Sequence, residues 1–459
     1  MDIEEKTFDD TVEEIIELLE NRQYRSAREE ILKNNGVDAA EILEEIIEEL
    51  GIKIAIVIFR MLPKDMSVEV FSYLTIDDQK DIINGITDME LSYIIDELDF
   101  DDKIDVLEEL PANIVDKILE KSTKAERKLI NTFLNYPDDC AGSLMTPEYI
   151  SLQGSMTVRE ALKHIKNEGM DSETVYTCYV KSSGRKLEGI VSLRTLVISD
   201  DDALISDLMH TDFVDVNVYD DQEEVSDAFM KYGFLAIPVV DNEGRLVGIV
   251  TVDDIMDVIE EEATEDIERM AGVLSDDDDR EYLDISVWGH IKSRIMWLTL
   301  MMFTAMITGG ILGAFEDMLT PTLVCYIPLL MGTSGNAGNQ AATLVTRGIA
   351  VGDLDTDDVL KVLWKEFRIS IGICLVLASI NFIKVLVIDR VDITTAVIIN
   401  LSLVIIVMIA KMLGGLIPMA AKKLGIDPAL VANPLLTSLS DMISVVTYFA
   451  IASLMMTNV

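Results

Sequence analysis

Histidine and cysteine are scarce in this chain of 459 residues, which contains three of the former and four of the latter. The cysteines show no metal-ligand spacing, and two of them lie in apolar runs, so we expect reduced thiols rather than a disulfide framework. They are Cys140, Cys178, Cys325 and Cys374. All three histidines precede the long apolar segments that follow residue 290. This excludes an imidazole-lined path for zinc or copper through a membrane.

Sequence signatures of hydrolases and of nucleic-acid binders are also missing. The chain has no His-Glu-x-x-His and no Gly-x-Ser-x-Gly sequence, so an intramembrane hydrolase is disfavoured and we expect no enzymatic activity. Basic residues number 37 against 82 acidic ones, for a formal net charge of −45. Such a chain repels a phosphate backbone, which excludes nucleic acid as a partner and favours cations.

The negative charge is confined to one part of the chain. From Ile291 onward we count 11 acidic and 11 basic residues, so the whole net charge falls within the first 290 residues. The N-terminus reads MDIEEK, without a basic segment or an apolar stretch, and carries no secretory signal. We therefore expect an acidic cytoplasmic portion followed by an apolar portion.

Residues 1–137 have the pattern of an all-α acidic domain. Between Asp10 and Phe133, apolar residues recur three and four positions apart, with acidic residues between them. Pro63, Gly85 and Pro111 interrupt this periodicity and predict ends of short helices.

Residues 138–259 contain a duplicated α/β pattern. Each copy runs from Leu-Met through strand, helix, strand, a glycine-containing turn, strand and helix, with a period of roughly 64 residues between Met145 and Met209. This duplication resembles a tandem pair of CBS domains. The next segment, 260–290, continues a helix that is apolar on one side and acidic elsewhere, and we interpret it as a connecting helix and linker.

Residues 291–459 contain apolar segments long enough to cross a bilayer. Four are about 21 residues or longer, and a fifth is interrupted by MGTSGNAGNQ. Basic clusters at Lys292 and Arg294, and from Lys361 to Arg368, favour a cytoplasmic side for those positions. Five crossings would then place the C-terminus outside. The expected spans are Ile295–Phe315, Pro321–Val351, Phe367–Ile388, Ile393–Ala421 and Pro428–Met455.

Asp441 is the first candidate for a pore residue. It lies in the apolar sequence NPLLTSLSDMISVV, and no basic residue of that span could pair with it. An uncompensated carboxylate at membrane depth costs several kcal/mol, so it should face water, a partner or a cation. The alternative is a protonated or hydrogen-bonded packing residue.

The segment GTSGNAGNQAAT, residues 332–343, is the second candidate. Its glycines would allow irregular backbone at membrane depth, which is tolerated where it lines a cavity, and Asn336, Asn339 and Thr343 supply oxygens. A small-residue packing motif is the alternative.

The combination favours a pore for a hydrated divalent cation. Mg²⁺ loses water reluctantly, so its path should be wide and lined by oxygens, with few carboxylates. One aspartate per chain, doubled by a dimer axis, meets this need. Oxygen ligands discriminate Mg²⁺ from Mn²⁺, Co²⁺ or Ca²⁺ only through size and hydration, so another divalent cation stays an alternative. A further alternative is a membrane protein that senses metal or nucleotide without transporting.

The order of segments and several long motifs resemble the MgtE family of Mg²⁺ channels over nearly the whole chain. The matching sequences are LMTPEY, DQEEV, GRLVGIVTVDD, EEATEDI, GTSGNAGNQAAT, GIDPALVANP and LLTSLSD. The resemblance implies a multidomain fold with an all-α superhelical N-domain, an α/β CBS pair, a connecting helix and a five-helix transmembrane domain. It further implies a homodimer in the lipid of the cell membrane, with the N-domain and CBS pair in the cytoplasm.

The same resemblance implies two groups of metal ligands. For the pore it implies Asp441 as the ion-binding residue, with Asn339, Thr343 and Asn433 as polar lining. For a cytoplasmic Mg²⁺ sensor it implies ten acidic residues: Glu69, Asp101, Asp105, Glu223, Asp254, Asp257, Glu262, Glu265, Asp266 and Asp427. At Gly233 the family pattern has an acidic ligand, so one sensor site is in doubt.

The acidic cytoplasmic residues suggest a gating mechanism. Carboxylates brought together repel one another, so their assembly needs counter-ions. We expect intracellular Mg²⁺ to hold the cytoplasmic domains together and the pore closed, and loss of Mg²⁺ to open it. CBS pairs often bind adenine nucleotides through a Ser/Thr-x-x-Asp turn; Thr251 to Asp254 has this form, and Arg194 could meet a phosphate. Since Ser192 to Thr195 lacks the acid, ATP binding is left open.

Overall fold

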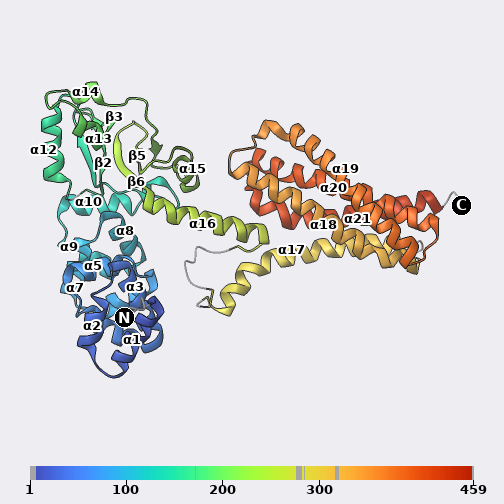
Figure 1. Cartoon of the computed structure of the whole chain (residues 1–459), viewed down its shortest axis with the longest axis horizontal. Coiled ribbons are helices and arrows are strands. Elements are labelled where there is room, and N and C mark those ends of the chain that lie inside the picture. The colour runs from blue at the N-terminus through green and yellow to red at the C-terminus, as the bar shows by residue number, and fades with distance from the viewer. Residues whose placement is uncertain (1–6, 171, 275–281, 284, 316–319, 457–459) are drawn as a thin grey trace, which may run out of the picture. The chain divides into compact units, whose positions relative to one another are not determined.

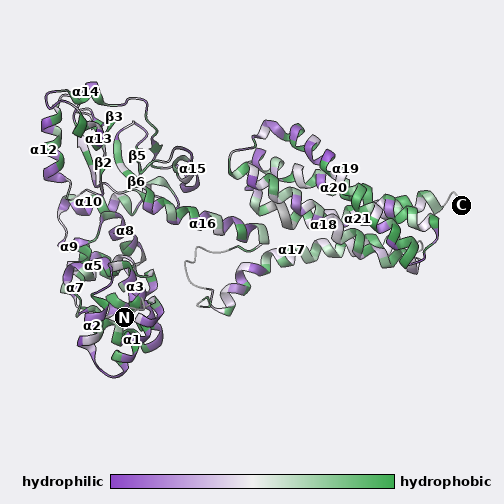
Figure 2. Ribbon diagram, viewed as in Figure 1, coloured by the Kyte–Doolittle hydropathy of each residue, from purple (hydrophilic) through white to green (hydrophobic). Residues whose placement is uncertain are grey.

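The computed structural model describes residues 7–456 apart from 171, 275–281, 284 and 316–319, and within helices it leaves the side chains of 109, 113 and 431–434 undescribed (Figure 1). The described chain divides into two compact units, Met1–Val258 and Ile259–Val459. Helices of the first unit carry alternating polar and apolar residues, whereas α19 to α21 of the second are largely apolar (Figure 2).

Short helices form the first part of unit one, as predicted. They are α1 (Phe8–Glu20), α2 (Tyr24–Ile31), α3 (Gly36–Leu50), α4 (Ile52–Phe59), α5 (Lys64–Ser72), α6 (Ile76–Gly85), α7 (Asp88–Glu97), α8 (Phe100–Glu109), α9 (Ala112–Lys121) and α10 (Lys124–Phe133). The predicted helix breaks are confirmed: Pro63 and Pro111 precede α5 and α9, and Gly85 ends α6. Proline suits these positions because it lacks the N–H that a helix interior would need.

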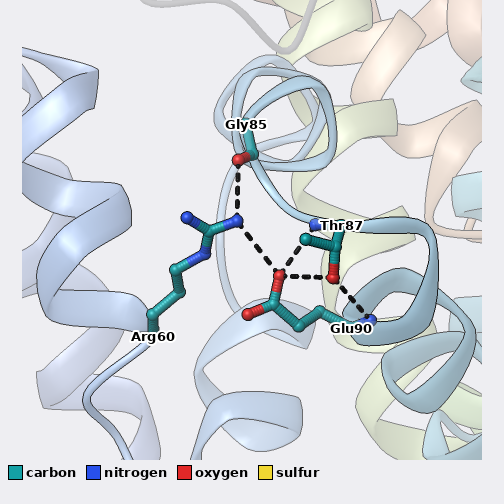
Figure 3. Close-up of polar contacts among 4 residues, drawn as sticks. All are labelled: Arg60, Gly85, Thr87 and Glu90. Atoms are coloured by element: carbon teal, nitrogen blue, oxygen red, sulfur yellow. Dashed lines mark hydrogen bonds and ion pairs between the residues drawn. The ribbon is translucent and has the colours of Figure 1, made fainter.

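A polar junction fixes the turn between α6 and α7 (Figure 3). The hydroxyl of Thr87 accepts a hydrogen bond from the Glu90 backbone N–H, and the Glu90 carboxylate accepts one from the Thr87 N–H at 2.7 Å. The Arg60 guanidinium, at the end of α4, donates to Glu90 at 3.1 Å and to the Gly85 carbonyl at 3.2 Å (Figure 3). The capping box and the two hydrogen bonds from Arg60 together fix the geometry of the turn between α6 and α7.

The rest of unit one consists of two similar three-stranded sheets with their helices. In each, the first strand runs parallel to the second and the third runs antiparallel to it. The strands are β1 (Tyr149–Leu152), β2 (Thr174–Lys181), β3 (Leu187–Ser192), β4 (Val216–Asn217), β5 (Ala236–Val240) and β6 (Leu246–Thr251). The helices are α11 (Ala141–Leu144), α12 (Val158–Glu168), α13 (Leu193–Ile198), α14 (Ile205–Leu208) and α15 (Gln222–Tyr232).

The two copies exchange their leading segments. Thr146, which leads the first copy, pairs with Ile249 in β6, and His210, which leads the second, pairs with Ile190 in β3. Glycine permits both approaches: a Cβ on Gly189 or on Gly248 would lie 2.8 Å from a carbonyl oxygen of the crossing segment. The sequence duplication therefore corresponds to two similar folds, and the leading segment of each copy pairs with the third strand of the other.

Long helices make up unit two. The connecting helix α16 (Val252–Ala271) begins in the second copy, and α17 (Val287–Ala314), α18 (Pro321–Ala350), α19 (Val359–Ile383), α20 (Ile393–Lys423) and α21 (Pro428–Met456) follow. A 3₁₀ turn, η2 (Thr356–Asp358), precedes α19, and a π turn, η3 (Lys384–Ile388), ends it. Within the described residues, four helical segments are long and apolar enough to cross a membrane: Val287–Ala314, Thr356–Ile388, Ile393–Lys423 and Leu435–Met456.

Helix α18 differs from expectation in its backbone. The glycines of 332–343 predicted an interrupted span, but α18 is helical from Pro321 to Ala350, and this expectation was wrong. Small residues fill one face of the helix and let α20 approach: a Cβ on Gly414 would lie 2.3 Å from the Gly338 carbonyl oxygen. This close packing stabilises a helix that glycine alone would weaken. The same segment also contains polar residues, and α18 is not among the four helices that are apolar enough to cross a membrane. A fifth membrane crossing therefore stays a prediction.

Candidate ion sites

Asp441 lies thirteen residues into α21, half-buried within the apolar bundle. Among the residues that the structure describes, no hydrogen bond or ion pair involves its carboxylate. The geometry therefore matches the sequence argument for a carboxylate without a neighbouring base. Such a group in a membrane helix needs water or a cation beside it.

A hydrogen bond joins α18 to α21 one turn away from Asp441. The Asn339 amide donates to the Thr437 hydroxyl at 3.3 Å, and Thr343 follows Asn339 by one turn on α18. Thr343 and Thr437 are both exposed. The structure thus brings two of the predicted pore residues, Asn339 and Thr343, onto one face, while the side chain of Asn433 lies outside the described part.

The two faces of α18 have opposite character. One is buried and built of small residues: Ser334, Gly335, Ala337, Gly338, Ala341 and Ala342. The other presents amide and hydroxyl groups that are exposed or partly exposed: Asn336, Asn339, Gln340 and Thr343. Residues three and four apart share a helix face, so these groups form one continuous polar stripe along α18.

Further polar side chains of α21 escaped the sequence reasoning. Thr437 bonds to Asn339, and the Thr304 hydroxyl of α17 donates to the Ser438 hydroxyl at 2.8 Å. The signal was available in LLTSLSD, where hydroxyls precede the aspartate by three and four residues. That spacing places them one turn from Asp441.

A cluster of three carboxylates occurs in unit one, at the junction of α8 with the first sheet. The ligand oxygens of Asp99, Glu148 and Glu173 all lie within 4.8 Å of one another. Three carboxylate oxygens at this separation are a suitable partial coordination sphere for Mg²⁺ or Ca²⁺. None of these residues was among the predicted sensor ligands, because they come from three segments far apart in sequence.

Two predicted ligands lie in the same acidic surroundings. Burial raises the pKa of Asp101 to about 8, and the charges of Asp254, Glu173 and Asp102 add to the increase. The pKa of Asp254 is raised by burial as well, although a hydrogen bond from Thr251 opposes the shift. The structure therefore brings Asp101 and Asp254 into one electrostatic cluster.

Neighbouring carboxylates share this perturbation. Burial raises the pKa of Glu173 to about 7, with further contributions from Asp99, Asp253 and Asp254. It raises the pKa of Asp102 to about 6, assisted by Asp99 and Asp254. We define the acidic cluster as Asp99, Asp101, Asp102, Glu148, Glu173, Asp253 and Asp254. The charged forms of its members repel one another, so without cations several of them keep their protons to higher pH than an isolated carboxylate does.

The other predicted sensor residues of unit one have more open surroundings. Glu69, Asp105, Glu223 and Asp257 are all exposed. The Glu69 side chain lies against Gly36, where a Cβ would come within 2.3 Å of it. Gly233 caps α15 in the left-handed conformation, with φ of +65°, which is a helix end typical of glycine.

The predicted ligands near the end of α16 contact an arginine. Arg269 forms an ion pair with Glu265, and its guanidinium lies 2.9 Å from the carboxylate of Asp427, at the start of α21. The pKa of Asp266 is raised by burial and by the charges of Asp427 and Glu262. This arrangement holds α16 against the first turn of α21 within unit two. A metal ion at Glu265 and Asp427 would compete with Arg269.

Two of the three nucleotide-binding candidates contact each other. The Thr251 hydroxyl donates to Asp254 at 2.5 Å, which is the turn that the sequence predicted, whereas Arg194 is exposed. Ser192 accepts a hydrogen bond from the Thr195 N–H and caps α13. ATP binding stays a prediction.

Comparisons with known proteins agree with this architecture. Residues 37–139 match the MgtE intracellular N domain, residues 141–200 and 205–261 match CBS domains, and residues 327–451 match a divalent cation transporter domain of the MgtE type. The magnesium transporter MgtE of Thermus thermophilus is 36% identical over 454 residues, covering 95% of this chain and 99% of that protein. This chain belongs to the MgtE family.

Other relatives extend the comparison. The magnesium transporter MgtE of Bacillus subtilis is 31% identical, covering 98% of both chains. A crystal structure of the soluble part of a magnesium transporter covers 56% of this MgtE-family chain with a TM-score of 0.50 and 32% identity. The predicted family and the predicted fold class, with its all-helical N-domain, CBS pair and apolar helical region, are confirmed. The two MgtE relatives, which cover 95% and 98% of the chain, are both named magnesium transporters.

Proposed function

We propose that this protein is a Mg²⁺ transporter of the cell membrane in which the ion passes Asp441. The observation that carries the proposal is an acidic side chain in an apolar helix, without a basic partner among the described residues, one turn from Thr437, which hydrogen-bonds to the polar stripe on α18. Two relatives that cover nearly the whole chain are named magnesium transporters. Membership in this family and the geometry of α18 and α21 support the same conclusion.

Asp441 and the polar stripe would have different roles in ion conduction. The stripe offers amide and hydroxyl oxygens to the water shell of the ion, so Mg²⁺ need not lose that shell entirely. The carboxylate of Asp441 supplies the negative charge that concentrates a dication in a medium of low dielectric constant. We propose Asn433 as a further lining residue, as the family resemblance implies.

A second copy of the chain would complete the path. The exposed polar face of α18 cannot contact lipid without losing hydrogen bonds of several kcal/mol in total. Two such faces brought together in a homodimer would enclose a wet conduit with two Asp441 carboxylates. The soluble domains would then lie in the cytoplasm and α18 would form the fifth crossing. We propose the domain boundaries that the sequence predicts: an N-domain at 1–137, the CBS pair at 138–259, the connecting helix and linker at 260–290 and the transmembrane domain at 291–459.

We propose further that intracellular Mg²⁺ closes the transporter through the acidic cluster. Carboxylates with raised pKa values are groups whose charged forms need a cation, and Asp99, Glu148 and Glu173 are close enough to share one. When the ion leaves, their repulsion would separate α8 from the CBS pair. The exposed acids Glu69, Asp105, Glu223 and Asp257, and those at the end of α16, would contribute additional Mg²⁺ sites.

Ion flux into vesicles tests the pore assignment. In reconstituted protein, replacing Asp441 with Asn should abolish Mg²⁺ uptake while the protein still assembles, because the neutral side chain no longer attracts a dication. Asp353→Asn, an exposed acid in the loop after α18, serves as the matched control and should retain uptake. Undiminished flux in the Asp441 variant would refute the assignment. The same assay with Mn²⁺, Co²⁺ and Ca²⁺ distinguishes a Mg²⁺ transporter from one for another divalent cation.

A further inference from the structure

Unit two contains a buried pair of oppositely charged side chains, Lys411 and Glu366, in addition to Asp441. Lys411, in the C-terminal half of α20, is 4% exposed, and Glu366, in α19, is 6% exposed. The Lys411 ammonium nitrogen lies 3.9 Å from a Glu366 carboxylate oxygen, and that oxygen has no hydrogen-bond partner among the described residues. Two buried charges in this geometry carry a desolvation cost that packing alone does not explain.

Lys411 belongs to the segment of α20 that packs on the buried face of α18, opposite the polar stripe. Ala410, its neighbour in the chain, places a carbonyl oxygen 3.3 Å from where a Cβ of Gly338 would lie, and Gly414 packs against the Gly338 carbonyl. Gly338 immediately precedes Asn339, which hydrogen-bonds to Thr437. The segment of α20 that contains Lys411 therefore contacts the backbone of the α18 segment that carries the stripe.

We infer that Glu366 is the counter-charge that keeps Lys411 from repelling the dication in the pore. This inference rests on the proposed function. A lysine without its carboxylate would place a positive charge behind the stripe, in a medium where charges act over long distances. Glu366 packs beside Gly415 of α20, where a Cβ would lie in ordinary contact, 3.5 Å from the Glu366 Cγ. Glu366 thus acts through Lys411, as a positioning residue for the field along the path.

A purely structural ion pair makes a different prediction. Breaking it from either side would leave one buried charge uncompensated, so both single variants would be impaired alike. The electrostatic role is asymmetric. Removing Glu366 leaves a positive charge that opposes Mg²⁺, whereas removing Lys411 leaves a negative charge that does not.

The test is a charge cycle measured by Mg²⁺ flux in vesicles, normalised to correctly assembled protein. We expect E366Q to lower flux at subsaturating Mg²⁺ by about tenfold or more and to raise the KM for Mg²⁺. K411Q should retain flux and lower that KM. The double variant E366Q/K411Q should recover most of the flux, because no net charge is left behind the stripe. E366D keeps the negative charge and should remain active. It provides the comparison with wild type if E366Q folds poorly.

Controls separate this inference from the pore assignment. Lys365→Gln removes an exposed charge from the adjacent position of α19 and should change neither flux nor KM. Equal loss in E366Q and K411Q, without recovery in the double variant, would overturn the electrostatic role and leave a structural one. Failure of Asp441→Asn to reduce flux would instead overturn the proposed function, whatever the charge cycle shows.

Discussion

Carboxylates in this chain differ in what neutralises them. Glu90 accepts hydrogen bonds from Thr87, which hold its pKa below the usual value, and Glu366 faces Lys411. Asp101 has no such compensation: burial and nearby acids raise its pKa to about 8. A carboxylate in the last situation releases its proton only at a cost, unless a cation takes the place of the proton.

A dependence of stability on pH follows from the acidic cluster. Asp101 and Glu173 have folded pKa values of about 8 and about 7, above their ordinary 3.8 and 4.5. Between those limits the folded state binds more protons than the unfolded state, so stability falls as pH rises from about 4 to about 8. Without Mg²⁺, the full-length protein should therefore have a lower Tm at pH 8 than at pH 6.

Substitution at Asp101 should remove part of this dependence. Asp101→Asn should raise the Tm at pH 8 without Mg²⁺ by a few degrees, and should reduce the further increase that millimolar Mg²⁺ produces. Glu188→Gln, an exposed acid in the first CBS copy, is the control and should leave both values unchanged. A Tm that does not respond to Asp101→Asn at pH 8 would contradict the cluster's electrostatic strain.

At the scale of elements, glycine decides which helices can touch. Gly338 and Gly414 bring α18 and α20 into backbone contact, and this contact turns the polar stripe away from the packed face. Elsewhere in the same unit, Gly372 in α19 has nothing within 4 Å of its potential Cβ. Glycine is thus required where α18 and α20 cross, whereas the Gly372 position of α19 has room for a side chain.

A methyl group at the crossing should separate the two helices. Gly414→Ala places a carbon 2.3 Å from the Gly338 carbonyl oxygen, so the backbone must shift, at a cost of about 1–3 kcal/mol. We expect a lower Tm in detergent and reduced Mg²⁺ flux. Gly372→Ala, measured in parallel, should preserve both. Wild-type behaviour of the Gly414 variant would mean that the close packing of α18 on α20 is not needed.

At the scale of the whole molecule, acidic soluble domains and a nearly neutral membrane unit share one chain. The first 290 residues hold the net charge of −45, so we expect bound cations to stabilise their packing. Arg269 provides one fixed cation, between Glu265 and Asp427, at the end of the connecting helix. Diffusible Mg²⁺ would supply the others.

Limited proteolysis tests this dependence in the full-length protein. Millimolar Mg²⁺ should protect residues 1–270 from cleavage, because bound ions screen the repulsion that separates the domains. The protection should shift to higher Mg²⁺ concentrations in a Glu173→Gln variant, and Glu188→Gln should behave as wild type. Equal cleavage with and without the ion would remove the sensor hypothesis.

Local patterns were sufficient to anticipate much of this protein. Pro63, Gly85 and Pro111 marked helix boundaries because their backbone preferences act on neighbouring residues alone. Asp441 stood out because a charge within an apolar span is unfavourable wherever the helix lies. The regular course of α18 was not anticipated, since packing against α20 overrode the flexibility that its glycines suggested.

The sequence by itself determined the order of domains, the duplicated CBS unit, the apolar spans and the candidate pore aspartate, because each depends on residues close together in the chain. Tertiary structure alone decided which distant charges meet: Asp99 with Glu148 and Glu173, Arg269 with Asp427, and Glu366 with Lys411. The physical reason is that electrostatic interaction depends on distance and burial in space. Neither quantity is encoded in the spacing of residues along the chain.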